Sequence, residues 1–121
     1  MNELFRIKLT IHGKPELPNK SHGHWATLQR QRERWHSVVA RSVLFRPEKP
    51  LKKCRLICVR HSSRKCDYDG LVYSFKPLVD ALVKQGIIVD DDLFTIVERS
   101  YQWCKTPEKQ AFVTIEVEEI I

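Results

Sequence analysis

Several common signatures are missing from this 121-residue chain, and each absence excludes a class of protein. No run approaches the eighteen consecutive apolar residues of a transmembrane helix, and residues 1–12 lack the apolar block of a signal peptide, so we expect a cytoplasmic protein. The four cysteines include no CxxC pair and the five histidines show no zinc spacing, which predicts free thiols and no zinc site. No serine or cysteine is arranged with a histidine as a nucleophile pair, so no covalent intermediate is expected.

The overall composition is that of an ordinary globular domain. Hydrophobic residues make up 42% of the chain and charged residues 30%, which argues against a disordered segment. There is neither an internal repeat nor a low-complexity tract. A chain of this length has room for one modest core, so we expect a single domain over residues 1–121.

Charge is distributed unevenly along the chain. Residues 1–65 contain 16 Lys and Arg but only 4 Asp and Glu, a net charge of +12. Residues 66–121 contain 5 and 11, a net charge of −6. The first part is therefore suited to attract a polyanion, while the second supplies carboxylates. The alternative is that the scattered basic residues only keep the surface soluble.

Hydrophobic periodicity predicts six elements in the order β-α-β-α-β-β. Phe5, Ile7, Leu9 and Ile11 alternate with polar residues, as in a half-buried strand. The expected elements are strands at 4–11, 53–60, 93–98 (an extension to Trp103 is left open) and 111–121, with helices at 26–45 and 71–82. This order predicts an α/β (α+β) fold with one mixed sheet of about four strands and two main helices packed on it.

Three details of this pattern are informative. The strand at 53–60 is apolar on both faces, which is typical of a central strand. Pro77 lies within the second helical stripe, so the helix either restarts there or is kinked. Gly86 is well placed to end that helix as a C-cap.

Two acidic clusters and one lysine form the most informative group of residues. Asp67 and Asp69 lie just before the second helix or at its start, and Asp90, Asp91 and Asp92 follow it. Neighbouring carboxylates repel one another unless they are solvated or bind a cation, and Mg²⁺ prefers oxygen ligands. The alternatives are that Asp67 or Asp69 caps the helix and that the Asp90–Asp92 segment is a solvated acidic turn.

Lys76 and Asp80 are four residues apart, one turn along the same helix. The plain interpretation of this spacing is a surface ion pair worth a few tenths of a kcal/mol, roughly 0.2–1. The functional interpretation places Lys76 beside a metal site, where it would neutralise charge on a phosphate. Both interpretations stay open on spacing alone.

The order and spacing of these pieces resemble a known family. The matching segments are Asp67-x-Asp69, Lys76-x-x-x-Asp80-Ala81-Leu82, Gly86-x-x-x-Asp90-Asp91 and, after the first strand, Leu17-Pro18-Asn19-Lys20. Together they resemble the RusA family of Holliday junction resolvases, which are small Mg²⁺-dependent endonucleases often associated with phages. The similarity covers most of the chain and follows the family's order of elements.

The resemblance implies roles for individual residues. Asp67, Asp69 and Asp91 match the family's metal-binding carboxylates, with Asp90 as an alternative to Asp91, and Lys76 matches its essential lysine. Two departures stand out: the family usually has Asn where this chain has Gly70, and the interval from Asp69 to Lys76 is about three residues longer.

The resemblance and the residues together predict a metal-dependent nuclease. We expect Mg²⁺, with Mn²⁺ as a substitute, to polarise a phosphodiester and activate a water, while Lys76 stabilises the developing negative charge. Candidate phosphate contacts are Lys20, Arg30, Arg32, Arg34, Arg60, Arg64 and Lys65. Such contacts give affinity that falls with salt and carry no sequence information.

The expected substrate is a four-way DNA junction, cut by paired nicks in recombination and repair. The approximate two-fold symmetry of a junction suits a homodimer with two active sites, and the family is dimeric. Three alternatives remain: a non-catalytic binding module that uses Trp25, Trp35 and Trp103, a nuclease acting on forks or flaps, and a structural protein whose acidic turns only cap helices. Tryptophans at such positions are more often part of the core.

Overall fold

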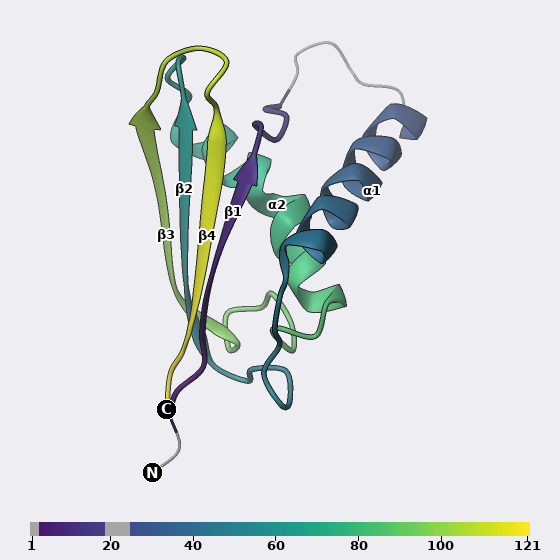
Figure 1. Ribbon diagram of the computed structural model, residues 1–121, viewed down its shortest axis with the longest axis vertical. Coiled ribbons are helices and arrows are strands. Elements are labelled where there is room, and N and C mark those ends of the chain that lie inside the picture. Colours follow the sequence, from purple (N-terminus) through teal and green to yellow (C-terminus); the bar gives the residue numbers. More distant parts are fainter. Residues whose placement is uncertain (1–2, 19–24) are drawn as a thin grey trace.

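The computed structural model describes residues 3–18 and 25–121, in which four strands and two helices follow one another in the predicted order (Figure 1). The elements are β1 (Arg6–His12), α1 (Trp25–Ser42), β2 (Cys54–Ser62), α2 (Tyr68–Lys84), β3 (Ile96–Lys105) and β4 (Phe112–Glu119). The strands form one mixed sheet, which confirms the predicted α+β fold. Lys20, one of the predicted phosphate contacts, lies outside the described residues.

The sheet has the strand order β1-β4-β2-β3. β4 pairs antiparallel with both β1 and β2, whereas β2 and β3 are parallel. β2 is therefore an interior strand, as its apolar residues on both faces predict. A parallel pair needs a long crossover connection, and here α2 with the acidic segment that follows it provides that connection.

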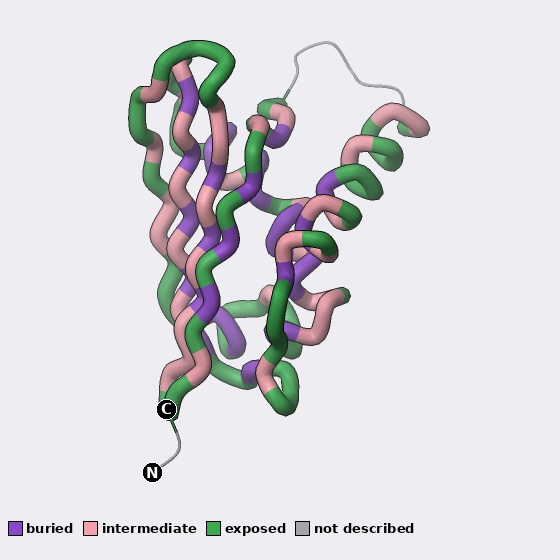
Figure 2. Tube along the Cα trace, viewed as in Figure 1, coloured by how far each residue is buried: buried purple, intermediate pink, exposed green. Residues whose placement is uncertain are grey.

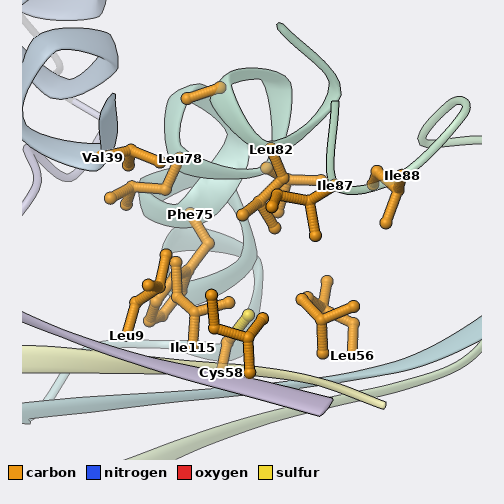
Figure 3. Close-up of a cluster of buried hydrophobic side chains, with 14 of the residues drawn as sticks. Leu9, Val39, Leu56, Cys58, Phe75, Leu78, Leu82, Ile87, Ile88 and Ile115 are labelled. Carbon is orange, nitrogen blue, oxygen red and sulfur yellow. The ribbon is translucent and has the colours of Figure 1, made fainter. Parts of the chain in front are cut away.

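Both helices lie on the same side of the sheet, and the core fills the space between the two layers (Figures 1 and 3). Buried residues alternate with more exposed ones along the strands (Figure 2). Leu9, Cys58 and Ile115 point from the sheet toward Phe75 and Leu78 of α2 (Figure 3). Because this face of the sheet is covered, the period-two pattern fixes which side chains face the helices.

α2 continues through Pro77 without a break, so the helix does not restart at that proline. Proline has no N–H, and its place in α2 leaves the carbonyl of Tyr73 without its usual helical donor. Tyr73 is on the exposed side of the helix, where water can hydrogen-bond that carbonyl. Burial of Phe75, Leu78 and Leu82 on the opposite side holds the helix in place.

The end of α2 confirms the prediction for Gly86, which has a φ of +75°. The N–H of Gly86 donates to the carbonyl of Val83 at 3.1 Å, and that of Ile87 donates to Leu82 at 3.0 Å. This pair of bonds is a Schellman motif, which satisfies the last carbonyls of the helix. The chain then pairs with Leu51 at Ile88 before it enters the acidic segment.

Some predicted boundaries are wrong by a few residues. α1 ends at Ser42 and not at residue 45. β3 begins at Ile96 and not at residue 93, because the side chain of Asp92 accepts hydrogen bonds from the backbone N–H groups of Phe94 and Thr95 and holds a turn there. Among the described residues, no helix is long and apolar enough to cross a membrane.

Candidate active site around Lys76

Lys76 contacts two of the acidic residues selected from the sequence. Its ammonium contacts a carboxylate oxygen of Asp91 and, at 3.0 Å, Oδ1 of Asp80. Asp91 is fifteen residues away along the chain, so this contact depends on the fold and not on helical spacing alone. The fold therefore brings Asp91 of the second acidic cluster to Lys76.

The electrostatics of this pair keep both groups charged. The hydrogen bond to Asp91 is the largest cause that raises the pKa of Lys76, and Asp80 adds to it. The same hydrogen bond from Lys76 holds the pKa of Asp91 below its ordinary value. The Lys76 side chain nevertheless remains 61% exposed, so its positive charge is accessible from solvent.

The ion pairs extend from Lys76 to the first helix. Oδ2 of Asp80 lies 3.6 Å from a guanidinium nitrogen of Arg32 on α1. A row of alternating charge thus joins α1, α2 and the segment before β3, and its members are Arg32, Asp80, Lys76 and Asp91. This row shows that the Lys76–Asp80 pair is more than an isolated surface ion pair within one helix.

The three aspartates before β3 have different contacts. Oδ1 of Asp90 accepts the N–H of Asp91 at 2.7 Å, and Oδ1 of Asp92 accepts those of Phe94 and Thr95. The hydrogen bond from the Thr95 backbone is the first cause that lowers the pKa of Asp92. Of these three aspartates, only Asp91 contacts Lys76, which favours Asp91 over Asp90 as the candidate site residue of this segment.

Asp67 is the N-cap of α2. Its Oδ1 accepts the N–H of Gly70 at 2.9 Å, so the capping alternative holds for Asp67. A Cβ at position 70 would lie 2.5 Å from that oxygen, and the cap would have to move. The cap therefore gives a local reason for glycine at position 70.

Asp69 lies in the first turn of α2 and is exposed. It is seven residues before Lys76, which is close to two helical turns, so both residues lie on the same exposed face about 10 Å apart along the axis. Shortening this interval by three residues would leave one turn and preserve the face. The longer interval noted in the sequence thus changes the distance between these residues but not their common orientation.

The acidic side chains suit Mg²⁺ by type, because carboxylate oxygens are its usual protein ligands. Within residues 3–18 and 25–121, however, no three His, Cys, Asp or Glu side chains gather as a group that could hold a metal ion. Asp67 and Asp69 stand at one end of α2, and Asp91 stands beside Lys76 farther along it. The assignment of these three residues to one shared metal site stays a prediction.

The predicted phosphate contacts fall into separate groups. Arg30, Arg32 and Arg34 are exposed on α1, and Arg64 and Lys65 are exposed just before Asp67.

The assignment of Arg60 as a phosphate contact is wrong, because its side chain is buried. Arg60 is only 3% exposed, and its Nη1 donates to the carbonyl of Pro15 at 2.6 Å. It faces the covered side of β2, where it anchors the segment before α1 and is removed from any bound DNA.

The tryptophans divide between core and surface. Trp35 is 1% exposed and its Nε1 donates to Glu16 at 2.7 Å, while Trp103 is partly buried and donates to Ser62. Trp25 is 76% exposed at the start of α1. The expectation that such residues belong to the core is therefore confirmed for Trp35 and wrong for Trp25.

Sequence reasoning missed one contributor to this region, Arg99. Its guanidinium donates to the backbone carbonyl of Asp91, which fixes the acidic segment against β3. Next to it on the same face of β3, the ring of Tyr101 lies 6.4 Å from that of Tyr68 and 6.0 Å from that of Phe75. The sequence signal that could have placed Arg99 on this face is the alternation of Arg99, Tyr101 and Trp103. This alternation begins just after residue 98, the expected end of the strand.

Comparison with known proteins adds no assignment. No protein-family model matches the chain, and no curated protein matches it either.

Proposed function

We propose that this protein is a Mg²⁺-dependent endodeoxyribonuclease that cuts branched DNA, with the four-way junction as its substrate. The observation that carries the proposal is the contact between Lys76 and Asp91 on the helix face that Asp69 also shares. A lysine paired with a carboxylate distant in sequence, with a further exposed carboxylate two helical turns away on the same face, suits phosphodiester hydrolysis.

The residues of this chain would act on one phosphodiester. Mg²⁺ would polarise the phosphodiester and activate the attacking water. Its candidate ligands are Asp67, Asp69 and Asp91, which do not gather as one group among the described residues. The Lys76 ammonium, kept protonated by its carboxylate neighbours, donates hydrogen bonds to the phosphate oxygens on which negative charge accumulates. Asp80 holds Lys76 from the side, and the arginines of α1 with Arg64 and Lys65 bind flanking phosphates.

A homodimer is part of the proposal, because resolving a junction requires two symmetrically placed nicks. The two edge strands of the sheet, β1 and β3, and the exposed side of α1 are the surfaces through which two copies would pair. Light scattering on the purified protein would measure the mass directly. A monomer at all concentrations would remove this part of the proposal.

The central experiment is cleavage of a synthetic four-way junction in Mg²⁺. Asp69→Asn should lose cleavage by orders of magnitude, about 10²-fold or more, while junction binding is retained. Glu108→Gln, at an exposed acid in the β3–β4 connection, is the matched control and should cut like the parent. If Asp69→Asn cuts as well as the parent, the assignment is wrong.

A non-catalytic nucleic-acid-binding module is the second candidate, and the exposure of Trp25 beside the arginines of α1 favours it. Aromatic and cationic side chains together bind single-stranded regions by stacking and phosphate contact. Nicking of the junction that requires Mg²⁺ would exclude this candidate. A panel of forks, flaps and four-way junctions would then define the preferred branch.

A further inference from the structure

A hollow of about 270 Å³ lies between α1 and α2, and nothing in the proposed hydrolysis makes use of it. Its apolar walls are Leu28 and Trp35 of α1 and Tyr73 and Pro77 of α2. We refer to it as the α1–α2 pocket. Its volume is just below the lower end of small-molecule sites, roughly 300 Å³, so it suits a single ring system and not an extended chain.

The walls of the pocket are held open by contacts on both sides. Trp35 is fixed by its hydrogen bond to Glu16, which also lines the pocket, and Arg32 is linked across the mouth to Asp80. Leu28 and Tyr73 are 44% and 48% exposed, so two large apolar side chains border the hollow without being covered. Exposed apolar surface with a polar border is typical of a binding site.

The polar border of the pocket includes groups of three kinds. Arg32 and Lys76 are donors with positive charge, Asp80 and Glu16 are acceptors, and the Gln31 amide is both. A flat ring with donors and acceptors along its edge, attached to an anionic phosphate, would use all of them. A nucleotide has this combination, and the positive charge of α1 is complementary to its backbone.

The position of the pocket relates it to the candidate active site. Lys76 lines the pocket and at the same time contacts Asp91. A ring in the pocket would therefore place its own phosphate near the lysine proposed to stabilise the reacting group. Bases at a branch point are already partly unstacked, so moving one out of the helix costs least there.

We propose that the α1–α2 pocket receives one unstacked DNA base at the branch point, stacked against Tyr73 and placed beside Leu28. This inference rests on the proposed action on branched DNA and adds how the strand is positioned for cleavage. The base is bound by stacking and edge hydrogen bonds, and the adjoining phosphate then lies next to Lys76.

The test is the fluorescence of 2-aminopurine placed, one position at a time, at the crossover of a four-way junction without divalent ions. The parent protein should raise the fluorescence severalfold at one position, because the base leaves its stacked neighbours. Leu28→Trp fills the pocket and should abolish that rise. Leu44→Trp, at a residue that is 88% exposed outside the pocket, makes the same substitution and should preserve it.

A second variant guards against a folding defect. Tyr73→Ala opens the stacking wall and should weaken junction binding by about tenfold, the scale of one lost base–aromatic contact, with duplex binding unchanged. Two results would overturn the proposed role of the pocket and leave the proposed function standing. One is an unaltered rise in fluorescence with Leu28→Trp, and the other is no rise at any position with a parent protein that binds and nicks junctions. A parent protein that does not bind branched DNA overturns both.

Discussion

The two acidic clusters have the same chemistry but different attachments. Asp67 contacts the backbone N–H of Gly70, three residues away, whereas Asp91 contacts the side chain of Lys76, fifteen residues away. The first contact can form as soon as α2 forms, and the second needs α2 and the start of β3 to be in place. The role of a carboxylate therefore depends on where its partner lies, which the identity of the residue does not reveal.

The largest expected effect comes from removing the partner of Asp91. Lys76→Gln should reduce single-turnover nicking of a four-way junction by roughly 10²–10³-fold, the scale seen when one group that stabilises a charged transition state is lost. Lys84→Gln, an exposed lysine in the last turn of the same helix, should have little effect. Equal rates for both variants would mean that Lys76 has only a structural role.

A smaller effect should separate Asp67 from Asp69. Asp67→Ala removes the N-cap of α2 and should lower the free energy of unfolding by about 1 kcal/mol, because the N–H of Gly70 loses its partner. Asp69→Ala removes the same charge from the first turn and should cost only about 0.3–1 kcal/mol, through the helix dipole. Urea unfolding measures both, and a larger loss in Asp69→Ala would reverse the assignment of the cap.

The smallest effect is the pH dependence of the Lys76–Asp91 pair. The pKa of Asp91 is lowered in the folded protein, so the pair stabilises the fold above the ordinary pKa of aspartate, 3.8, and the contribution is lost as the pH falls below that value. The raised pKa of Lys76 means that the contribution is also lost at alkaline pH above 10.5. Because Lys76 is largely exposed, the size should be only about 0.2–1 kcal/mol.

Asp91→Asn tests this dependence. The stability difference between the parent and this variant should shrink between about pH 7 and about pH 3 in urea unfolding, and it should shrink in high salt as well. Asp90→Asn is the control, since the carboxylate of Asp90 contacts a backbone N–H and not Lys76. A difference that is the same at both pH values would show that the pair does not contribute to stability.

The architecture could be predicted from the sequence because one face of the sheet is covered, so apolar and polar residues alternate along its strands. Ile7, Leu9 and Ile11 all face the helices, and the stripe from Leu71 to Leu82 forms the buried side of α2. The end of α2 was accessible for a local reason too, since only a residue that readily adopts positive φ suits the position of Gly86. These features follow from periodicity and from single-residue preferences.

The remaining features depend on contacts between distant segments. The burial of Arg60 needs the carbonyl of Pro15 as its partner, and the contact from Arg99 needs Asp91 to approach β3. The pairing of Arg32 with Asp80 requires the packing of α1 on α2. A charged residue in a strand pattern carries no local sign of such a partner, so the sequence alone assigned Arg60 to the surface.

Parallel strands cannot be joined by a tight turn, and the crossover connection between β2 and β3 contains α2. Deleting a single residue between Asp69 and Lys76 would rotate the residues on one side of the deletion by about 100° relative to those on the other, which would break the buried stripe as well as the shared exposed face. Insertions and deletions in this stretch are therefore tolerable only in steps of about three or four residues. The helical crossover thus fixes the spacing of these residues in units of one helical turn.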